Sequence, residues 1–206
     1  EAFSRDEDIH AATAAAVFGI KLNEVTYDQR SFAKRVNFGL IYGMGAYRLA
    51  RDSDLTLPEA RKFIDTYFKR LPDVERYLNE TKKRAQEDGF VETLFGRRRY
   101  FPIFKDPKAN AQTKEAELRA AINHPIQGTA ADIMKRAMIE LDTVLKTDGR
   151  GANLLLQVHD ELVLEVPNQH LADIQALVLQ IMEGAYPLKV RLKANAEAGI
   201  NWRDMA

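Results

Sequence analysis

Residues 30–43 read RSFAKRVNFGLIYG, and this stretch places cations and aromatic rings at a regular interval. A charged or aromatic residue recurs at every fourth position, so on an α-helix these residues follow one polar side. They are Arg30, Lys34, Phe38 and Tyr42. The opposite side is apolar and is the side that we expect to be buried, with Phe32, Ala33, Val36 and Leu40. The pattern therefore predicts an amphipathic helix from about Asp28 to Tyr42, ending at Gly43.

The polar side of this helix has two interpretations. Cations at one end and aromatic rings at the other suit a ligand with phosphates at one end and a base and sugar at the other. From spacing alone, a solvated cationic face with aromatic rings at a domain contact is the more common arrangement. Residues 29–51 contain five cations and no acid, although the whole chain balances 30 Lys+Arg against 30 Asp+Glu. A net charge of zero therefore does not exclude a nucleic-acid partner.

Helices are predicted on both sides of this stretch in the first half of the chain. Asp8 and Gly19 bracket an Ala-rich run, and Thr56 followed by Pro58 marks the start of another helix. That helix is expected to end near Arg70, and a further one to run from 73 to 88, followed by a strand over 90–94 and a basic turn over 96–99.

The second half of the chain adds strands. Residues 113–146 predict one long helix, interrupted at His124-Pro125 because proline removes a helical hydrogen bond. Two β-rich runs, 154–158 and 162–166, predict a hairpin with His159, Asp160 and Glu161 between its strands. A helix over 171–182 and a strand over 188–196 follow. This order predicts an α+β fold with an antiparallel sheet.

Composition excludes several classes of protein. The chain has 206 residues and 46% hydrophobic residues, enough to bury a sizeable core. It has no cysteine, so it has no disulfide framework, thiolate metal site or cysteine nucleophile. No apolar run approaches the roughly 20 residues that cross a bilayer, and no membrane partner is expected.

Five blocks, in order along the chain, resemble the conserved segments of the family A DNA polymerases, the bacterial DNA polymerase I type. RSFAKRVNFGLIYG resembles motif B, and LQVHDELVLEVP, from Leu156, resembles motif C. The other three blocks are DIHAATAAAVFG from Asp8, VETLFGRRRY from Val91 and RAAINHPIQGTAADIMKRAMIELD from Arg119. The resemblance implies a mostly helical fingers subdomain over 1–115 and the C-terminal part of an antiparallel-sheet palm over 116–206. It also implies template-directed nucleotidyl transfer from dNTP with two Mg²⁺ ions, in the cytoplasm of a bacterium at the nucleoid, with a phage or organellar origin as the open alternative.

The resemblance implies a role for each matching residue. Nucleotide contacts are implied for His10, Arg30, Lys34, Phe38 and Tyr42. Contacts to primer–template DNA are implied for Arg97, Arg98, Arg119, Asn123, Gln127 and His159. Catalytic roles are implied for Lys34, Asp160 and Glu161, with Asp160 as a ligand of the metal. From the residues alone, Asp160 and Glu161 are an ordinary solvated pair at a turn.

Two metal ions need more than one well-placed carboxylate. Adjacent residues on an extended backbone point to opposite faces, so Asp160 and Glu161 are poorly placed to bind the same pair of ions. In the family the second aspartate comes from motif A, and no similar segment occurs in this chain. We expect motif A upstream of Glu1, together with the thumb, as a partner of these residues. The isolated chain is then expected to bind nucleotide and DNA without extending a primer.

Other interpretations remain open. A phage-type single-subunit RNA polymerase has a similar motif B, and a non-catalytic nucleotide- or DNA-binding module would keep the same surfaces. The basic cluster at 82–84 has acidic neighbours and is expected to be solvated surface. The cluster at 97–99 follows Gly96 in a turn and resembles a family segment near the template strand, and this resemblance implies contact with phosphate.

Overall fold

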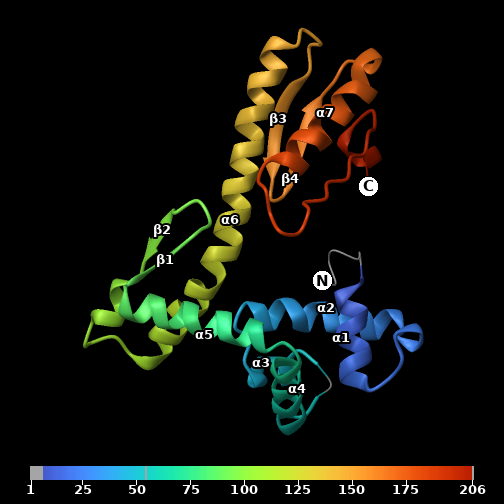
Figure 1. Ribbon diagram of the computed structural model, residues 1–206. Coiled ribbons are helices and arrows are strands. Elements are labelled where there is room, and N and C mark those ends of the chain that lie inside the picture. Colours follow the sequence, from blue (N-terminus) through green and yellow to red (C-terminus); the bar gives the residue numbers. More distant parts are fainter. Residues whose placement is uncertain (1–6, 54, 206) are drawn as a thin grey trace. The chain divides into compact units, whose positions relative to one another are not determined.

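The structure is a computed structural model that describes residues 7–53 and 55–205 (Figure 1). It divides into two compact units, Glu1–Thr129 and Ala130–Ala206. The division falls inside the longest helix, α6 (Ala111–Thr147). The boundary expected between residues 115 and 116 falls in the same helix, 14 residues earlier than the end of the first unit.

The first unit is mostly helical. Its first helix begins and ends at the predicted signals, whereas the short helix over 46–51 was not predicted. Asp8 caps α1 (Ile9–Phe18) by accepting from the backbone N–H groups of His10 and Ala11, both at 3.0 Å. Gly19 ends this helix with a φ of 69°. The remaining helices of the unit are α2 (Tyr27–Ile41), α3 (Ala46–Arg51), α4 (Leu57–Arg70) and α5 (Pro72–Glu87), with a short 3-10 helix at Leu22–Glu24.

Capping boxes fix the starts of α2 and α4. Thr26 and Gln29 exchange side-chain to backbone hydrogen bonds at the start of α2, as Thr56 and Glu59 do at the start of α4. Such a cap satisfies backbone N–H groups that a helix leaves without an internal partner. The start of α4 at Thr56 confirms the prediction from sequence.

One hydrophobic cluster holds α2, α3 and α4 together. Phe32 meets Phe63 edge-on at 5.9 Å between ring centroids, which is a favourable geometry for aromatic pairs. The buried members of the cluster are Val36, Leu40, Leu49, Ala60, Phe63 and Tyr67. The side of α2 predicted to be apolar is therefore the buried side.

A small hairpin completes the first unit. β1 (Phe90–Glu92) pairs antiparallel with β2 (Arg98–Tyr100), and a 3-10 helix at Pro102–Lys105 follows. Val91 and Phe101 pack against Ala85 of α5 and Ala121 of α6. β1 is shorter than the strand predicted over 90–94. Its partner β2 begins inside the basic turn predicted over 96–99.

The predicted interruption of the long helix at Pro125 is wrong. The structure has α6 continuous from Ala111 to Thr147, with Pro125 inside it. A proline removes one backbone donor, and the hydrogen bonds on either side still hold the helix. Thr129 Oγ1 also donates to Pro125 O at 2.5 Å, which adds a side-chain bond at this point of the helix.

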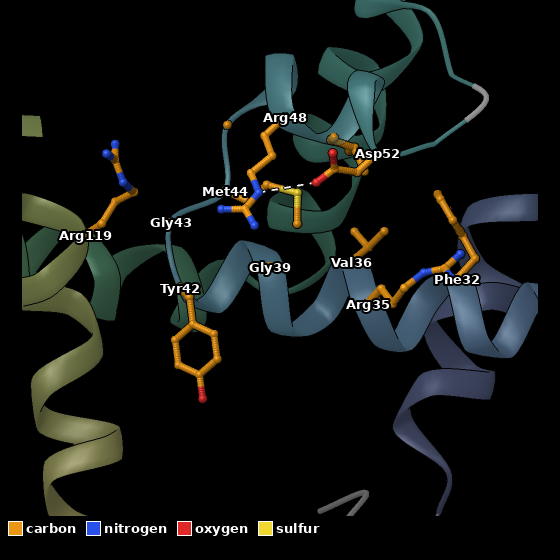
Figure 2. A pocket seen from close by; sticks show the side chains of 12 residues that line it. Phe32, Arg35, Val36, Gly39, Tyr42, Gly43, Met44, Arg48, Asp52 and Arg119 are labelled. Atoms are coloured by element: carbon orange, nitrogen blue, oxygen red, sulfur yellow. Dashed lines mark hydrogen bonds and ion pairs between the residues drawn. The ribbon is translucent and has the colours of Figure 1, made fainter. Parts of the chain in front are cut away.

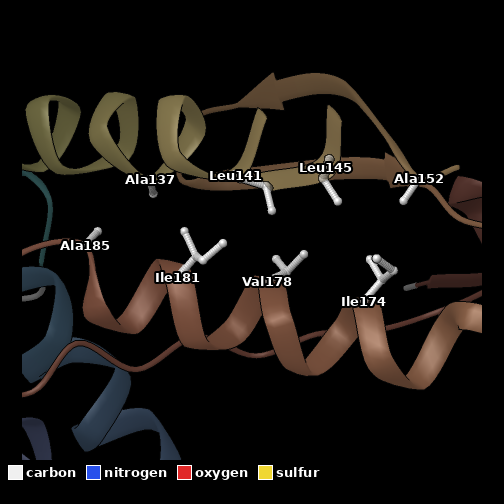
Figure 3. Packing of buried hydrophobic residues seen from close by; sticks show 8 residues of the cluster. All are labelled: Ala137, Leu141, Leu145, Ala152, Ile174, Val178, Ile181 and Ala185. Atoms are coloured by element: carbon white, nitrogen blue, oxygen red, sulfur yellow. The ribbon is translucent and has the colours of Figure 1, made fainter. Parts of the chain in front are cut away.

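The second unit is a hairpin and two helices around one core. β3 (Asn153–Val158) pairs antiparallel with β4 (Glu161–Glu165), with an irregularity in register between Leu154 and Leu156. Figure 3 shows the core side chains of α6 pointing toward those of α7 (Leu171–Gly184). The buried residues are Ala137, Leu141, Leu145, Ala152, Ile174, Val178, Ile181 and Ala185. With helices and two small antiparallel sheets, the chain has the predicted α+β class.

Two details of the second unit differ from the predictions. Residues 188–196 were expected to form a strand, but they run without regular secondary structure. A strand needs a neighbouring backbone, whereas here side chains of α7 bond to this segment: Gln175 Nε2 donates to Ala196 O, and Glu183 Oε1 accepts from Ala194 N. Glu161 was expected in the turn, and it is the first residue of β4, paired with Val158.

No helix among residues 7–53 and 55–205 is long and apolar enough to cross a membrane.

Candidate functional site

Helices α1 and α2 pack together and present a face that holds four of the residues singled out in the sequence. Burial of Val36 and Leu40 fixes the rotation of α2, because the residues on its other side must then face outward. Phe38 is 45% exposed and the Arg30 side chain 41% exposed. We call the surface formed by His10, Arg30, Lys34 and Phe38 the α1–α2 face.

His10 is held from behind by α2. Its Nδ1 lies 3.0 Å from Nδ2 of Asn37, and its ring centroid lies 5.6 Å from that of Phe38. Burial lowers the pKa of His10 below its usual value, and the nearby charges of Arg30 and Lys34 lower it further, whereas Asp8 opposes the shift. His10 is therefore predominantly neutral at neutral pH.

Arg30 is held by Asp8. Its Nε donates to Asp8 Oδ2, a contact that joins the N-terminal cap of α1 to α2 across 22 residues of sequence. The hydrogen bond from Arg30 lowers the pKa of Asp8, burial opposes the shift, and the backbone N–H groups of Ala11 and His10 lower it further. A guanidinium has five N–H donors, so the bond through Nε leaves its remaining donors for a ligand.

The positive field of the stretch 29–51 is weaker than its composition predicts, because acids from outside the stretch reach its cations. Arg48 and Arg51 both pair with Asp52, at 3.3 and 2.9 Å, and Arg30 pairs with Asp8. Within the part of the chain that the structure describes, Lys34 has no ion pair and is exposed. The cationic character of the α1–α2 face therefore depends mainly on Lys34.

A pocket of about 650 Å³ lies at the turn between α2 and α3 (Figure 2). It is lined by residues of α2, α3 and the loop between them, together with Arg119 of α6. Figure 2 shows the ring of Tyr42 pointing to the opposite side of α2 from Met44 and Arg48. Gly43 makes the turn with a φ of 79°, and a Cβ there would lie 3.2 Å from Arg119 Cγ. Tyr42 and Arg119 both line the pocket, and Figure 2 shows their side chains pointing in different directions.

The other residues expected to contact DNA in the first unit already have partners within the chain. Asn123 Nδ2 donates to Gln127 Oε1 at 2.7 Å, one turn along α6, so the two amides share one side of the helix without a kink. Arg97 Nη2 donates to Gly128 O at 3.1 Å, which ties the β1–β2 turn to α6. Arg98 pairs with Glu92 at 2.6 Å. Any DNA contact by these side chains must compete with those bonds or use their remaining donors.

The tip of the β3–β4 hairpin belongs to the second unit. His159 has a φ of 53°, a conformation that residues other than glycine adopt uncommonly, and Asp160 follows it in the two-residue turn. Gln157 Nε2 donates to His159 O at 2.5 Å. His159, Asp160 and Glu161 are all exposed, so the hairpin presents two adjacent carboxylates to solvent.

The described residues do not form a complete metal site. Among residues 7–53 and 55–205, no group of three His, Asp or Glu side chains is placed to hold an ion. The Asp160 carboxylate has oxygen atoms of the kind that Mg²⁺ prefers as ligands, but it is only one side chain. The expected pair of Mg²⁺ ions therefore needs ligands beyond those that these residues bring together.

Three features of the site were missed in the sequence. Asn37 is 3% exposed and lies on the apolar side of α2, where a lone polar residue was the available signal. Asp8 was identified only as a helix cap, and Asp52 lies just beyond the basic stretch. The partners of Asn37 and Asp8 depend on how α1 packs on α2, which periodicity does not reveal, whereas Asp52 pairs with cations of its own helix.

The family model described as DNA polymerase family A matches residues 1–204. The DNA polymerase I of Pseudomonas aeruginosa is 50% identical over 202 residues, which are 98% of this chain and 22% of that protein. The DNA polymerase I of Deinococcus radiodurans is 47% identical over 204 residues, 99% of this chain and 21% of that protein. The chain therefore spans about a fifth of the length of these curated relatives.

A solved structure has the same fold. It is the POL domain of Pol1 from M. smegmatis, in complex with DNA primer-template and dNTP. It superposes with a TM-score of 0.93 and 40% sequence identity, and the match covers 100% of this chain and 36% of that one.

Proposed function

This chain belongs to DNA polymerase family A, and we propose that it carries the dNTP-binding face and part of the DNA-binding surface of a template-directed DNA polymerase. In this proposal residues 1–115 are the fingers subdomain and 116–206 the C-terminal part of the palm. The rival interpretation as a single-subunit RNA polymerase is set aside, because the family and the named relatives are DNA polymerases.

The observation that carries the proposal is the composition of the α1–α2 face. It combines the Lys34 ammonium, the Arg30 guanidinium and a half-buried imidazole with the exposed ring of Phe38. Cationic hydrogen-bond donors suit the oxygens of a triphosphate, and an exposed ring offers a surface for a sugar or base. We assign His10, Arg30 and Lys34 to the triphosphate and Phe38 to the sugar.

The turn after α2 suits nucleic acid rather than phosphate alone. Tyr42 presents a ring at the end of the helix, and the aliphatic part of the Arg119 side chain lies beside Gly43. We assign Tyr42 to the nascent base pair, and Arg119, Asn123 and Gln127 to primer–template DNA. Arg97, Arg98 and His159 are assigned to the same DNA.

The reaction joins the primer 3′-hydroxyl to the α-phosphate of the dNTP and releases pyrophosphate. Most of the protein's contribution to such a transfer is positioning and charge stabilisation. Lys34 and Arg30 hold the triphosphate and offset its negative charge as the leaving group departs. Mg²⁺, when bound, would activate the hydroxyl and stabilise the pyrophosphate. Asp160 is proposed as one of its ligands, with Glu161 beside it, and further carboxylates from motif A outside these residues.

Nucleotide binding tests the α1–α2 face directly. The change is Lys34→Ala, and the expected result is about tenfold weaker binding of a dNTP, because a charge-assisted hydrogen bond to phosphate is lost. The measurement is a fluorescence titration of this chain at low salt. The matched control is Lys62→Ala on α4, also an exposed lysine, which should leave binding unchanged. Equal affinity of both variants and the original chain would refute the assignment.

Primer extension separates a polymerase from a binding module. We expect the 206-residue chain to bind primer–template DNA without extending it in the presence of Mg²⁺, because the described residues supply too few carboxylates. Restoring an upstream segment that carries motif A should give extension, and Asp160→Ala in that protein should abolish it. Robust extension by the 206 residues alone would contradict the need for motif A. Unchanged extension by the Asp160 variant would contradict the metal assignment.

A further inference from the structure

Asn37 is a buried amide on the otherwise apolar side of α2. It is 3% exposed, and its Nδ2 lies 3.0 Å from both Thr13 Oγ1 and His10 Nδ1 on α1. An amide buried without hydrogen bonds costs free energy, and Nδ2 has two hydrogens to satisfy. The two contacts use both hydrogens, so Asn37 joins α2 to two residues of α1 that lie one helical turn apart, while its Oδ1 has no hydrogen-bond partner among the described residues.

Thr13 determines which end of the Asn37 amide faces α1. The Thr13 hydroxyl donates its only hydrogen to Ile9 O, at 2.7 Å. A carbonyl oxygen can only accept, so the hydrogen of Thr13 is committed and its oxygen can only accept from Asn37. The Asn37 atom that faces Thr13 must therefore be the NH₂ group.

The same NH₂ group determines the tautomer of His10. Since Asn37 Nδ2 donates to His10 Nδ1, that nitrogen must be unprotonated. A neutral imidazole carries one hydrogen, which must then lie on Nε2, on the far side of the ring from Asn37. The chain of donors and acceptors from Ile9 through Thr13 and Asn37 thus ends in a donor on the α1–α2 face.

We propose that Asn37 is a positioning residue: it holds His10 in the Nε2–H tautomer, so that the imidazole donates a hydrogen bond to a phosphate of the bound nucleotide. That the ligand is a nucleotide rests on the proposed function of the α1–α2 face. The tautomer itself does not depend on any ligand.

The surroundings of His10 keep its ring neutral, so its tautomer decides whether Nε2 donates or accepts a hydrogen bond. The charged groups near it are Asp8 on its own helix and Arg30 and Lys34 on α2, and the ring of Phe38 lies beside it. Burial and the two cations outweigh Asp8, so the pKa of His10 is lowered and the ring is neutral at physiological pH. A neutral ring can either donate or accept at Nε2, and an acceptor there would repel phosphate oxygen.

Nitrogen-15 NMR of this chain tests the tautomer without nucleotide. We expect a pyridine-type signal for His10 Nδ1 and a pyrrole-type signal for Nε2, assigned with His10→Gln. Asn37→Asp should reverse the two signals, because a carboxylate can only accept and would take a hydrogen from Nδ1. Asn37→Leu should give a mixture of tautomers. A protonated Nδ1 in the original chain, or an unchanged pattern in both variants, would overturn the proposal.

Nucleotide binding at two pH values tests the consequence. At pH 8, Asn37→Asp should bind dNTP about tenfold more weakly, because Nε2 then accepts and one bond to phosphate is lost. A carboxylate at position 37 should raise the pKa of His10, because it favours the charged ring. Lowering the pH should then protonate His10 in this variant and restore binding toward that of the original chain, since a protonated ring donates from both nitrogens. A defect that is the same at both pH values would indicate misfolding or lost packing and would refute positioning by tautomer.

The control distinguishes this inference from the proposed function. Thr81→Val removes another buried hydroxyl, which is 6% exposed and donates to Tyr77 O at 2.8 Å, away from α1. It should leave the His10 signals and nucleotide affinity unchanged. If the original chain bound no dNTP, the proposed function would fail, and the NMR pattern would still decide whether Asn37 sets the tautomer of His10.

Discussion

The α1–α2 face and the tip of the β3–β4 hairpin both carry groups suited to phosphate chemistry, but they are supported in different ways. On the α1–α2 face, Asp8 holds Arg30 and the buried Asn37 holds His10. At the hairpin tip, a side-chain hydrogen bond from Gln157 to His159 O supports a turn whose carboxylates are exposed. Two groups of the first face are therefore oriented by partners within the chain, whereas the tip presents carboxylates that, in the proposed function, further groups complete.

This difference has a physical basis in the surroundings of each group. A helix pair can bury an amide such as Asn37 between its members and use it to orient an exposed side chain. A two-residue hairpin turn has no interior, so its side chains depend on whatever packs against them. The proposed need for additional carboxylates at the tip agrees with this contrast. Four stability measurements, from the largest expected effect to the smallest, test how each region is held.

The core beneath the hairpin is expected to give the largest effect. Leu141→Ala should lower the free energy of unfolding by about 3 kcal/mol, because it empties a fully buried site between α6 and α7. Urea denaturation measures the loss, and hydrogen exchange should show faster opening of β3 and α7. Ile139→Ala, two residues earlier and 70% exposed, is the control and should stay within about 0.5 kcal/mol. A loss as small as that of the control would mean that this cluster does not hold the hairpin.

The turn after α2 comes next. Gly43→Ala should cost about 1–2 kcal/mol, because φ is 79° and the added Cβ would crowd Arg119 and Ile122. The comparison variant is Gly184→Ala at the end of α7, where φ is not left-handed and a Cβ would meet nothing within 4 Å. That change should be neutral or stabilising by up to about 1 kcal/mol. Thermal unfolding measures both changes in stability. A change of the same sign in the two variants would contradict the turn geometry.

The ion pair at the α1–α2 face should contribute less. Asp8→Asn keeps a residue that caps helices well and removes the charge that pairs with Arg30. At pH 7 and low salt we expect a loss below about 1 kcal/mol, since both side chains are about 40% exposed. The folded pKa of Asp8 is lowered, so its contribution is present above the unfolded value of 3.8 and is lost as pH falls through the folded pKa. A difference that persists below that pH, or in high salt, would show that the ion pair is not its cause.

The smallest effect is expected at the hairpin tip. Asp160→Asn should leave the free energy of unfolding unchanged within about 0.5 kcal/mol, because the side chain is exposed in a turn. Chemical denaturation of the two chains in parallel measures the difference. A clear loss would show that the tip is braced after all and would remove the contrast with the α1–α2 face. A gain would indicate that the two adjacent carboxylates repel one another.

Much of the fold was predictable because its signals are local. Asp8 before α1, Gly19 after it, and Thr56 before α4 act within a few residues of themselves, and each lies where the sequence places it. The long helix was predicted but its interruption was not found, since one missing donor at Pro125 does not outweigh the surrounding helix. The strand expected over 188–196 did not form because alternation favours a strand only where a neighbouring backbone is available.

The candidate site was predictable in its list of residues and not in its contacts. The resemblance named His10, Arg30, Lys34, Phe38 and Tyr42, and the structure leaves all five at least partly exposed. It did not reveal Asn37, because a single amide on an apolar helix side has no periodic signature. The roles of the five residues toward a nucleotide remain predictions for the binding experiments.

The sequence by itself determined the family, the helix caps and which side of α2 is buried, because motifs, cap residues and periodicity are all read over short distances. It also determined that the stretch 29–51 contains cations without acids. Only the tertiary structure decided that Asp8, 22 residues before Arg30, would pair with it. In the same way, packing of α1 on α2 brought Asn37 to His10 across 27 residues. Those contacts, set by packing rather than by spacing, orient the groups of the α1–α2 face.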